Sequence, residues 1–380
     1  MITRAKFQNF KALRDVEITF DSRLTVLVGP NGSGKTSVLQ GINVVCQIVG
    51  ASEPHHHLPL TGFAGIGLPG MNLEIAGINR IADLPRCVSS GARLAEFRLE
   101  CVTTSKVGSE VIAVIQTDKN VRHGEPLSTF LTASEAARNQ RWQSDAAPAD
   151  LRALFGGSVL LRLDPLQLAA PSVVVSKPPL MQPSGAGLPS TLAYIALNQP
   201  DDFATIVKGF RSVIPIVSRI RFDKEQAGGG YGDVIVFDFL GAANVNASFA
   251  SSGTLSALGL LTSILGPTRP RVVLLDDLDH GLHPKAQMEL ISVLRKLLEQ
   301  YPDLQIIATS HSPYILSKLE WNEVRVTGLK DDGSAICARL EDHPEVERWR
   351  EAMTPGEFWS HAGDDWVKKL DKSQPATAAP

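Results

Sequence analysis

The stretch LTVLVGPNGSGKTSVLQGI, residues 24–42, joins an apolar run that ends at Gly29 to a helical pattern that begins after Lys35. It predicts a strand, a phosphate-binding loop and a helix. The spacing is that of the P-loop motif, whose glycines let backbone N–H groups turn toward anionic oxygens. We expect Lys35 to reach the β- and γ-phosphates of a nucleotide and Thr36 to present its hydroxyl to Mg²⁺. The alternative is a Gly-rich turn that binds nothing. The residues expected to contact the nucleotide are Gly29, Pro30, Asn31, Gly32, Ser33, Gly34, Lys35, Thr36 and Ser37.

Size and composition limit the classes of protein. The chain has 380 residues, 43% hydrophobic and 20% charged, so it can bury a large core spread over two or three lobes. A net charge of −3 gives no whole-molecule basic field, so any DNA contact has to be a local patch. We expect a cytoplasmic protein without a membrane partner, because no signal-peptide or membrane-span pattern is present. Four widely spaced cysteines favour reduced, buried thiols: Cys46, Cys87, Cys101 and Cys337.

The first part of the chain alternates strands and loops. Residues 2–20 predict two antiparallel strands around the turn NFKALRD, and residues 94–103 and 110–117 predict a hairpin. Residues 50–92 indicate loop and short helix. The three histidines at 55–57 could suggest a metal, but adjacent histidines on a regular element cannot all converge on one ion.

The middle of the chain is mainly helix and loop. Residues 118–157 have a helical character, residues 159–165 predict a strand, and the Pro- and Gly-rich residues 171–190 predict a loop. Two amphipathic helices follow and end at Pro215. The basic residues of the next segment fit either a solvated hairpin tip, which we favour, or a DNA contact: Arg219, Arg221 and Lys224.

A second constellation lies at RVVLLDDLDHGLHP, residues 271–284. An apolar strand that ends in acids is what a Walker B element needs. We expect this strand to lie beside the P-loop strand, with Asp276 holding Mg²⁺ and Asp277 polarising the attacking water. Pro284 then begins a core-packing helix. The following strand, LQIIATS, delivers His311 at its end, where a sensor of the γ-phosphate is wanted.

Between the P-loop stretch and the Walker B stretch, an apolar helix begins in FASSGTLSALGLLTSIL, residues 249–265. Hydroxyls and free N–H groups gather at its positive end, at Ser251, Ser252, Gly253 and Thr254. This end could bind phosphate or be a simple helix cap. Since the P-loop already holds one nucleotide, we expect the helix end to serve the nucleotide of a second subunit.

Taken together, VGPNGSGKTS, SSGT, VVLLDDLDHGLHP and IIATSHSP resemble an ATPase of the ABC/SMC-type superfamily. The GLHP and TSHSP pieces resemble AAA-type ATPases of the OLD (overcoming lysogenization defect) group, many of which occur in bacterial anti-phage defence. The resemblance implies an α/β fold, in which an ABC/SMC-type P-loop ATPase head combines an N-terminal antiparallel β subdomain with a RecA-like core. It also implies a homodimer in which two heads sandwich two ATP molecules.

The resemblance assigns roles to individual residues. Lys35 and Thr36 correspond to Walker A, Asp276 to the Mg²⁺ acid, Asp277 to the catalytic acid and His311 to the switch histidine. The signature that contacts the partner's ATP corresponds to Ser251 and Gly253, with Ser252 between them. An aspartate replaces the usual catalytic glutamate, so we expect slow hydrolysis. No Q-loop glutamine can be assigned, and Gln116 is only a guess.

The predicted organisation has four parts: the first part of the ATPase head over 1–120, a mostly helical insertion over 121–216, the second part of the head over 217–340, and a C-terminal docking segment with a disordered tail over 341–380. About 70 residues follow His311, too few for the Toprim nuclease domain of OLD nucleases. The aromatic residues near the C-terminus form either a packing clasp or a docking surface for an effector: Trp349, Phe358, Trp359 and Trp366.

These observations predict an ATP-gated ATPase that controls a separately encoded effector, such as a nuclease, in defence against phage. A DNA-repair ATPase resembling the RecF group, or a nucleotide-dependent scaffold without hydrolysis, are the alternatives. ATP-dependent, salt-sensitive DNA binding would favour the repair ATPase, and a lack of turnover would favour the scaffold.

Overall fold

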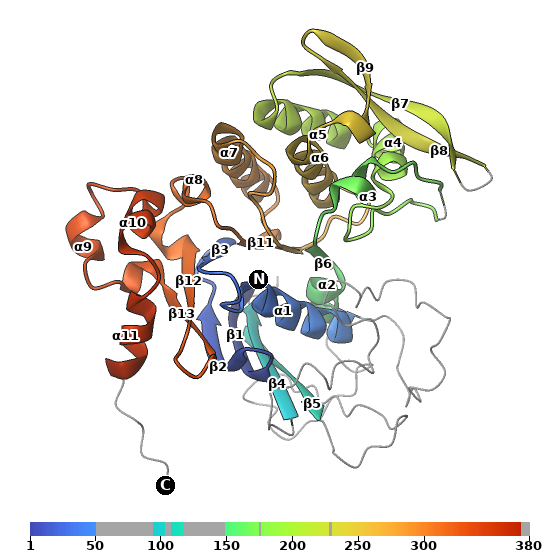
Figure 1. The fold of residues 1–380 in the computed structure, drawn as a ribbon. Helices are drawn as coiled ribbons and strands as arrows, with labels where there is room; N and C mark the ends of the chain where they lie inside the picture. Colours follow the sequence, from blue (N-terminus) through green and yellow to red (C-terminus); the bar gives the residue numbers. More distant parts are fainter. Residues whose placement is uncertain (51–93, 103–107, 117–148, 175, 228–229, 374–380) are drawn as a thin grey trace.

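A computed structural model describes residues 1–50, 94–102, 108–116, 149–174, 176–227 and 230–373 (Figure 1). The histidines at 55–57, Cys87, most of the predicted 118–157 helical region and the C-terminal tail lie outside these ranges. The described residues form a central, mainly parallel sheet, an antiparallel sheet beside it and a lobe with a third sheet. This is the predicted α/β class.

The central sheet carries the ends of both motif strands. Its order is β13-β12-β3-β11-β10-β6, and every neighbouring pair is parallel except β12 with β13. Parallel strands are covered on both faces, which is why β3 (Leu24–Val28), β10 (Val272–Leu275) and β11 (Gln305–Thr309) are continuous buried runs. The remaining strands are β6 (Ser158–Leu161), β12 (Val324–Leu329) and β13 (Ala335–Arg339).

One expectation about this sheet is wrong. The Walker B strand β10 does not lie beside the P-loop strand β3, because β11 pairs with both and separates them. Strand order depends on contacts between distant segments, so a local apolar pattern does not determine it. β6, which falls in the range assigned to the helical insertion, pairs with β10 as a strand of the central sheet.

The antiparallel sheet confirms the predicted hairpins. Its order is β2-β1-β4-β5, formed by β1 (Ile2–Phe10), β2 (Leu13–Thr19), β4 (Leu94–Val102) and β5 (Gly108–Gln116). Phe10 and Phe97 pack edge to face with ring centroids 4.9 Å apart. Helix α1 (Lys35–Gly50) follows the P-loop and approaches this sheet closely: a Cβ on Gly41 would lie 2.5 Å from the Phe7 ring. Only glycine fits there, so this contact helps to position the helix.

A separate lobe carries the third sheet, at the upper right of Figure 1. It contains β7 (Val217–Ala227), β8 (Gly230–Phe239) and β9 (Ala242–Asn246), with α3 (Pro165–Ala169), α4 (Leu188–Asn198), α5 (Pro200–Val213) and α6 (Ser252–Ile264). On the hairpin, Arg221 pairs with Asp238 at 2.7 Å and Lys224 with Asp233 at 2.6 Å. These pairs fit the interpretation of a solvated hairpin, since two of its cations are already matched within it.

The remaining helices cover the core or form the C-terminal segment. They are α2 (Ala149–Gly156), α7 (Pro284–Gln300), α8 (Pro313–Leu316), α9 (Val346–Trp349), α10 (Pro355–Ala362) and α11 (Trp366–Ser373).

The C-terminal aromatic residues pack inward. Phe358 and Trp366 are 1% and 7% exposed, and Trp349 and Trp359 are partly buried against the same core. Trp321 contacts Phe358 with ring centroids 5.3 Å apart. The structure therefore favours the packing clasp for Phe358 and Trp366, whose side chains are too buried to dock an effector.

Burial also explains the cysteines that the structure describes. Cys46 and Cys101 are buried, and burial raises the pKa of Cys46 to about 12 and that of Cys101 to about 11. Among the described residues, Cys46, Cys101 and the half-buried Cys337 form no disulfide. Within the described ranges, every helix is too short or too polar to span a bilayer.

Candidate nucleotide site

The P-loop connects β3 to α1 through three glycines with positive φ: Gly29 (139°), Gly32 (80°) and Gly34 (94°). A Cβ on Gly29 would lie 2.2 Å from the carbonyl oxygen of Thr327 on β12, so the loop and its neighbouring strand can touch only through a glycine. Lys35 reaches back across the loop, where Nζ donates to the carbonyls of Gly29 and Pro30, both at 2.9 Å. Burial lowers the pKa of Lys35, and the acids nearby oppose that shift.

Asp276 and Thr36 face each other although β11 separates their strands. The Thr36 hydroxyl lies 3.0 and 3.2 Å from the two carboxylate oxygens of Asp276. Mg²⁺ is usually held by one or two protein oxygens, with phosphates and waters completing its octahedron. This hydroxyl and carboxylate fit such a site, and the structure brings them together as the sequence predicts.

Asp277 sits in a left-handed backbone conformation at φ 57°, which directs the chain out of the sheet. Its backbone N–H donates to the hydroxyl of Thr309 at 2.9 Å, and the same hydroxyl donates to Asp276 at 2.8 Å. Burial raises the pKa of Asp277, and Asp276 and Asp279 add to the shift. Thr309, at the end of β11, was not singled out from the sequence, although it lies two residues before His311.

A polar network holds the segment after β11. Asp279 accepts hydrogen bonds from the Ser310 hydroxyl at 2.7 Å and from the backbone N–H of His311 at 3.2 Å. The side chain of His311 is exposed and lines the same cavity as the P-loop. The segment after Walker B therefore fixes the backbone from which His311 projects.

The P-loop residues, the acids and His311 meet around one cavity of about 450 Å³. Its lining is Asn31, Gly32, Gly34, Lys35, Thr36, Ser37, Arg162, Asp276, Asp277, Asp279, His280 and His311. Three charged or titratable residues that sequence analysis missed or left unassigned stand out here, namely Arg162, Asp279 and His280. The lining contains no glutamine among the described residues, and Gln116 ends the edge strand β5 of the antiparallel sheet.

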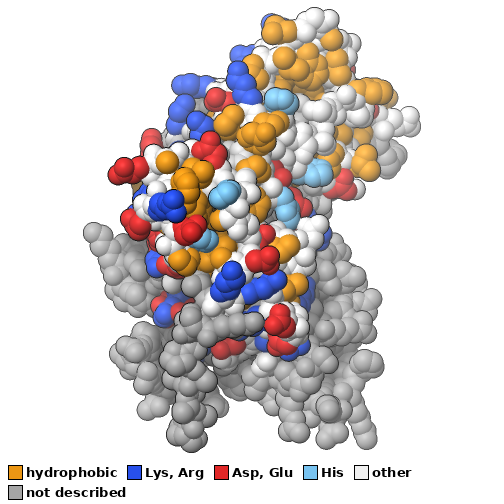
Figure 2. Space-filling model, turned by 60° about the vertical axis from the view of Figure 1, so that its left-hand side comes forward, with side chains coloured by type: hydrophobic (Ala, Val, Ile, Leu, Met, Phe, Trp, Pro, Cys, Tyr) orange, Lys and Arg blue, Asp and Glu red, His pale blue; other side chains and the backbone are white. Residues whose placement is uncertain are grey.

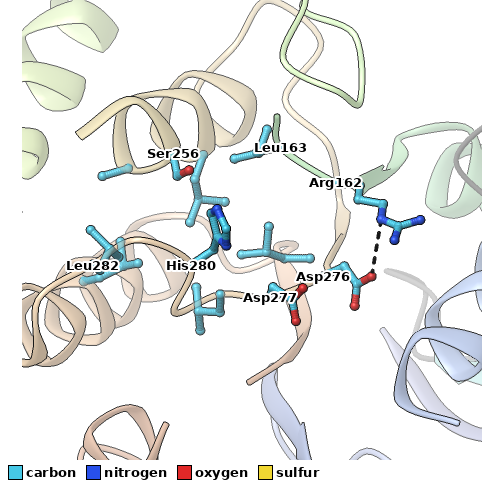
Figure 3. A pocket seen from close by; sticks show the side chains of 12 residues that line it. Arg162, Leu163, Ser256, Asp276, Asp277, His280 and Leu282 are labelled. Carbon is cyan, nitrogen blue, oxygen red and sulfur yellow. Dashed lines mark ion pairs between the residues drawn. The ribbon is translucent and has the colours of Figure 1, made fainter. Parts of the chain in front are cut away.

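Arg162 reaches the site through strand pairing rather than through a motif. It follows β6, whose Leu161 pairs with Leu275 of β10, so Arg162 emerges next to Asp276. Its Nε lies 3.8 Å from Asp276 Oδ2 (Figure 3). The sequence predicts a strand over residues 159–165, which places Arg162 inside that strand, and a single basic residue within a strand is too common to single out.

The signature residues lie away from this cavity. Ser251 is the exposed N-cap of α6, and its hydroxyl accepts from the backbone N–H of Thr254 at 3.2 Å. Gly253 packs so closely on the loop after Walker B that a Cβ there would lie 2.2 Å from the carbonyl oxygen of Gly281. None of Ser251, Ser252 and Gly253 lines the P-loop cavity.

A smaller cavity of about 140 Å³ connects α6 with the two acids (Figure 3). Ser256 of α6, His280 and both Asp276 and Asp277 line it. Helix α6 and the two acids after β10 therefore line the same cavity.

The chain matches a family described as "AAA domain, putative AbiEii toxin, Type IV TA system" over residues 24–317. This match covers most of the chain and includes every motif described above. The protein belongs to this family of AAA ATPase domains.

Curated relatives match shorter or more divergent regions. The Septu protein PtuA of Bacillus thuringiensis is 35% identical over 69 residues, which is 18% of this chain and 17% of the relative. PtuA of Bacillus mycoides is 22% identical over 347 residues, 86% of this chain and 40% of the relative. The OLD nuclease of Thermus scotoductus is 37% identical over 59 residues, 16% of this chain and 11% of the relative. The chain therefore spans less than half the length of these relatives.

Solved structures of Smc heads share the fold. A Smc head bound to the C-terminal winged-helix domain of ScpA covers 91% of this chain and 99% of its own, with 14% identity and a TM-score of 0.61. A second Smc head, with an extended coiled coil, bound to a ScpA domain derived from Pyrococcus furiosus, covers 92% and 99%, with 13% identity and a TM-score of 0.58. At this identity the likeness shows the fold alone, which is the predicted ABC/SMC head.

Proposed function

We propose that this protein binds and hydrolyses ATP with Mg²⁺, and that two copies close over the nucleotide. The observation that carries the proposal is the convergence of the P-loop lysine, the facing pair Thr36 and Asp276, and Asp277 on one cavity. A P-loop protein that only bound ATP would need Asp276 at the metal but would not need a second acid, Asp277, beside it.

Each residue has a task in phosphoryl transfer, where catalysis consists mainly of positioning and charge stabilisation. In the structure, Lys35 Nζ donates to two carbonyls of the loop that would surround the phosphates. With ATP bound, it would donate to phosphate oxygens instead. Thr36 and Asp276 would hold Mg²⁺, which neutralises charge on the β- and γ-oxygens when bound. Asp277 would orient the attacking water, and His311 would contact the γ-phosphate. Because Asp277 is one methylene shorter than glutamate, hydrolysis is slow in this proposal.

The position of α6 supports closure by a second copy. Ser251 at the N-terminal end of the helix is exposed, and Ser251, Ser252 and Gly253 do not line their own P-loop cavity, so the Ser251 side chain is accessible to another chain's phosphate at the positive end of the helix. Two large apolar side chains stand exposed close by, Phe249 at 83% and Leu166 at 80%. Figure 2 shows further hydrophobic side chains gathered over the upper lobe that carries β7, β8 and β9. Exposed apolar groups of this kind mark interaction surfaces.

The relatives support a role in defence. Two are Septu proteins and one is an OLD nuclease. We place this chain in the cytoplasm as the ATPase part of such a system, where its ATP-dependent closure controls a separately encoded effector, such as a nuclease. Co-purification with the product of an adjoining gene tests this part, and a stable complex that responds to ATP is the expected result.

A second function is a DNA-repair ATPase. It is favoured by the Rad50 ATPase of Methanopyrus kandleri, which is 48% identical over 44 residues, 12% of this chain. Binding of DNA that requires ATP and weakens with salt would support this alternative, and its absence at low salt would remove it.

Turnover by the purified protein tests the proposed activity. Wild type should release phosphate from ATP in the presence of Mg²⁺, and Lys35→Ala should lose nucleotide binding. Lys224→Ala is the control, since Lys224 is ion-paired on the distant hairpin. Hydrolysis that survives Lys35→Ala would contradict the proposal, and ATP binding without any turnover would indicate a scaffold.

A further inference from the structure

Arg162 is a second cation at the P-loop cavity, and neither the motifs nor the family match gives it a role. Its backbone is fixed: the Arg162 N–H donates to the carbonyl of Pro183 and the Asp276 N–H donates to that of Leu161, both at 3.0 Å. Since β6 and β10 are parallel and in register, the two residues after them emerge at the same edge of the sheet.

The side chain is held far less tightly than the backbone. Nε lies 3.8 Å from Asp276 Oδ2, an ion-pair distance that is too long for a hydrogen bond, and 61% of the Arg162 side chain is exposed. The Asp276 carboxylate is buried, but a long contact to a cation that is mostly exposed to solvent contributes little to stability. Asp276 does not depend on it either, because the hydroxyls of Thr36 and Thr309 already donate to its carboxylate. The guanidinium is therefore free to turn to another anion.

The cavity beside it is where that anion would lie. Lys35 approaches the cavity from β3, and Arg162 approaches from β6, at the other end of the row β3-β11-β10-β6. Arg162 lies next to the acids that would face the terminal phosphate, whereas the loop glycines surround the inner phosphates. A guanidinium also matches phosphate better than an ammonium does, because its planar fork donates two parallel hydrogen bonds.

We propose that Arg162 binds the terminal phosphate of ATP from the same chain that provides the P-loop, and that it thereby lets the site distinguish ATP from ADP. With its weak contact to Asp276 given up, the guanidinium would turn to the γ-phosphate, and Mg²⁺ held by Thr36 and Asp276 would supply the charge that balances the carboxylate. This inference rests on the proposed function, because it requires the cavity to hold ATP.

The test compares affinities for ADP and for a non-hydrolysable ATP analogue, both with Mg²⁺, by calorimetry. Arg162→Ala should weaken binding of the analogue about tenfold, which corresponds to about 1.4 kcal/mol, and leave ADP affinity within about twofold. Arg162→Lys should fall between Arg162→Ala and wild type. Arg269→Ala is the matched control, because Arg269 is also half exposed and pairs with a carboxylate, Asp202, at 2.7 Å. It should change neither affinity.

Two results would overturn the assignment while leaving the proposed function intact. Equal losses of ADP and analogue affinity in Arg162→Ala would mean that the side chain only supports the site. Unchanged affinity for both would mean that it contacts no phosphate. A wild-type protein that binds neither nucleotide would overturn the proposed function and this inference together.

Discussion

Thr309 is a single buried residue that organises both acids. Its hydroxyl accepts from the backbone N–H of Asp277 and donates to the carboxylate of Asp276, and the side chain is completely buried. A hydroxyl has one donor and two acceptor sites, so one group can satisfy both partners. Thr309 therefore turns Asp276 toward Thr36 and stabilises the unusual backbone of Asp277.

Thr309→Val should lower kcat for ATP about tenfold to a hundredfold while changing the affinity for nucleotide much less. The valine has nearly the same shape but leaves the Asp277 N–H unpaired, at a cost of about 1–3 kcal/mol. Thr309→Ser keeps the hydroxyl and should retain most of the activity. Steady-state kinetics and calorimetry of the three proteins measure these effects.

Thr25→Val is the control for that change. Thr25 lies on β3 and is also completely buried, but its hydroxyl has no hydrogen-bond partner in the part of the chain that the structure describes. Its replacement should leave kcat unchanged and should not lower the free energy of unfolding. An equal loss of kcat in Thr25→Val and Thr309→Val would show that neither effect depends on the hydroxyl bridge.

At the scale of elements, the start of α6 and the loop after Walker B depend on each other. Gly281 has φ 69°, and a Cβ there would lie 2.3 Å from the Ser252 hydroxyl and 2.8 Å from the Gly253 nitrogen. The contact therefore requires glycine at both Gly253 and Gly281. The start of α6 is positioned directly by the segment that follows Asp277.

Gly281→Ala should displace the start of α6 and lower the melting temperature more than Gly333→Ala does. Gly333 also has a positive φ, 76°, but a Cβ added there would have no described atom within 4 Å, so its replacement adds backbone strain alone, about 1–2 kcal/mol. The difference between the two variants in thermal unfolding measures the contact. Equal melting temperatures would show that α6 does not rest on this loop.

Sequence patterns here predict the individual strands and helices well, but they do not predict which strands lie next to one another in the sheet. The strand and helix around the P-loop, the antiparallel hairpin and the helix after Pro284 all follow from local periodicity and turn chemistry, and the structure confirms them. The insertion of β11 between β3 and β10 was missed, and so was Arg162, because both depend on strand order. The two motifs were enough to predict that Lys35 and Asp276 serve one nucleotide. Arg162 belongs to no motif, and only the pairing of β6 with β10 places it at the cavity.

At the scale of the whole molecule, the C-terminal segment is fastened by an aromatic cluster around His343. Its ring lies edge to face with Phe358 at 4.9 Å and with Trp366 at 4.8 Å. Burial lowers the pKa of His343, and Glu345 opposes the shift. The backbone N–H of Glu345 donates to Nδ1 at 3.1 Å, which requires the neutral ring.

The protein should lose stability as the pH falls from 7.5 to 5.5. Because the folded state lowers the pKa of His343, the stabilisation is fully present above the unfolded pKa of about 6.5 and is lost as the pH falls through that value toward the lower folded pKa. His343→Phe cannot titrate and should show a smaller difference in melting temperature between the two pH values. The same difference in variant and wild type would exclude His343 as the cause.

The central claim at this scale is that one copy grips ATP and a second copy closes over it with α6. Asp277→Asn should slow hydrolysis and so retain ATP in the closed dimer. Adding Ser251→Asp keeps an N-cap residue but places a negative charge beside the partner's phosphates. Ser251→Asn also caps the helix and is the neutral control.

The most direct measurement is the mass of these proteins with saturating Mg-ATP, by sedimentation. The account predicts a dimer for Asp277→Asn alone and with Ser251→Asn, and a monomer that still binds ATP for Asp277→Asn with Ser251→Asp. A monomeric Asp277→Asn protein, or a dimer that persists equally with Ser251→Asp, would contradict it.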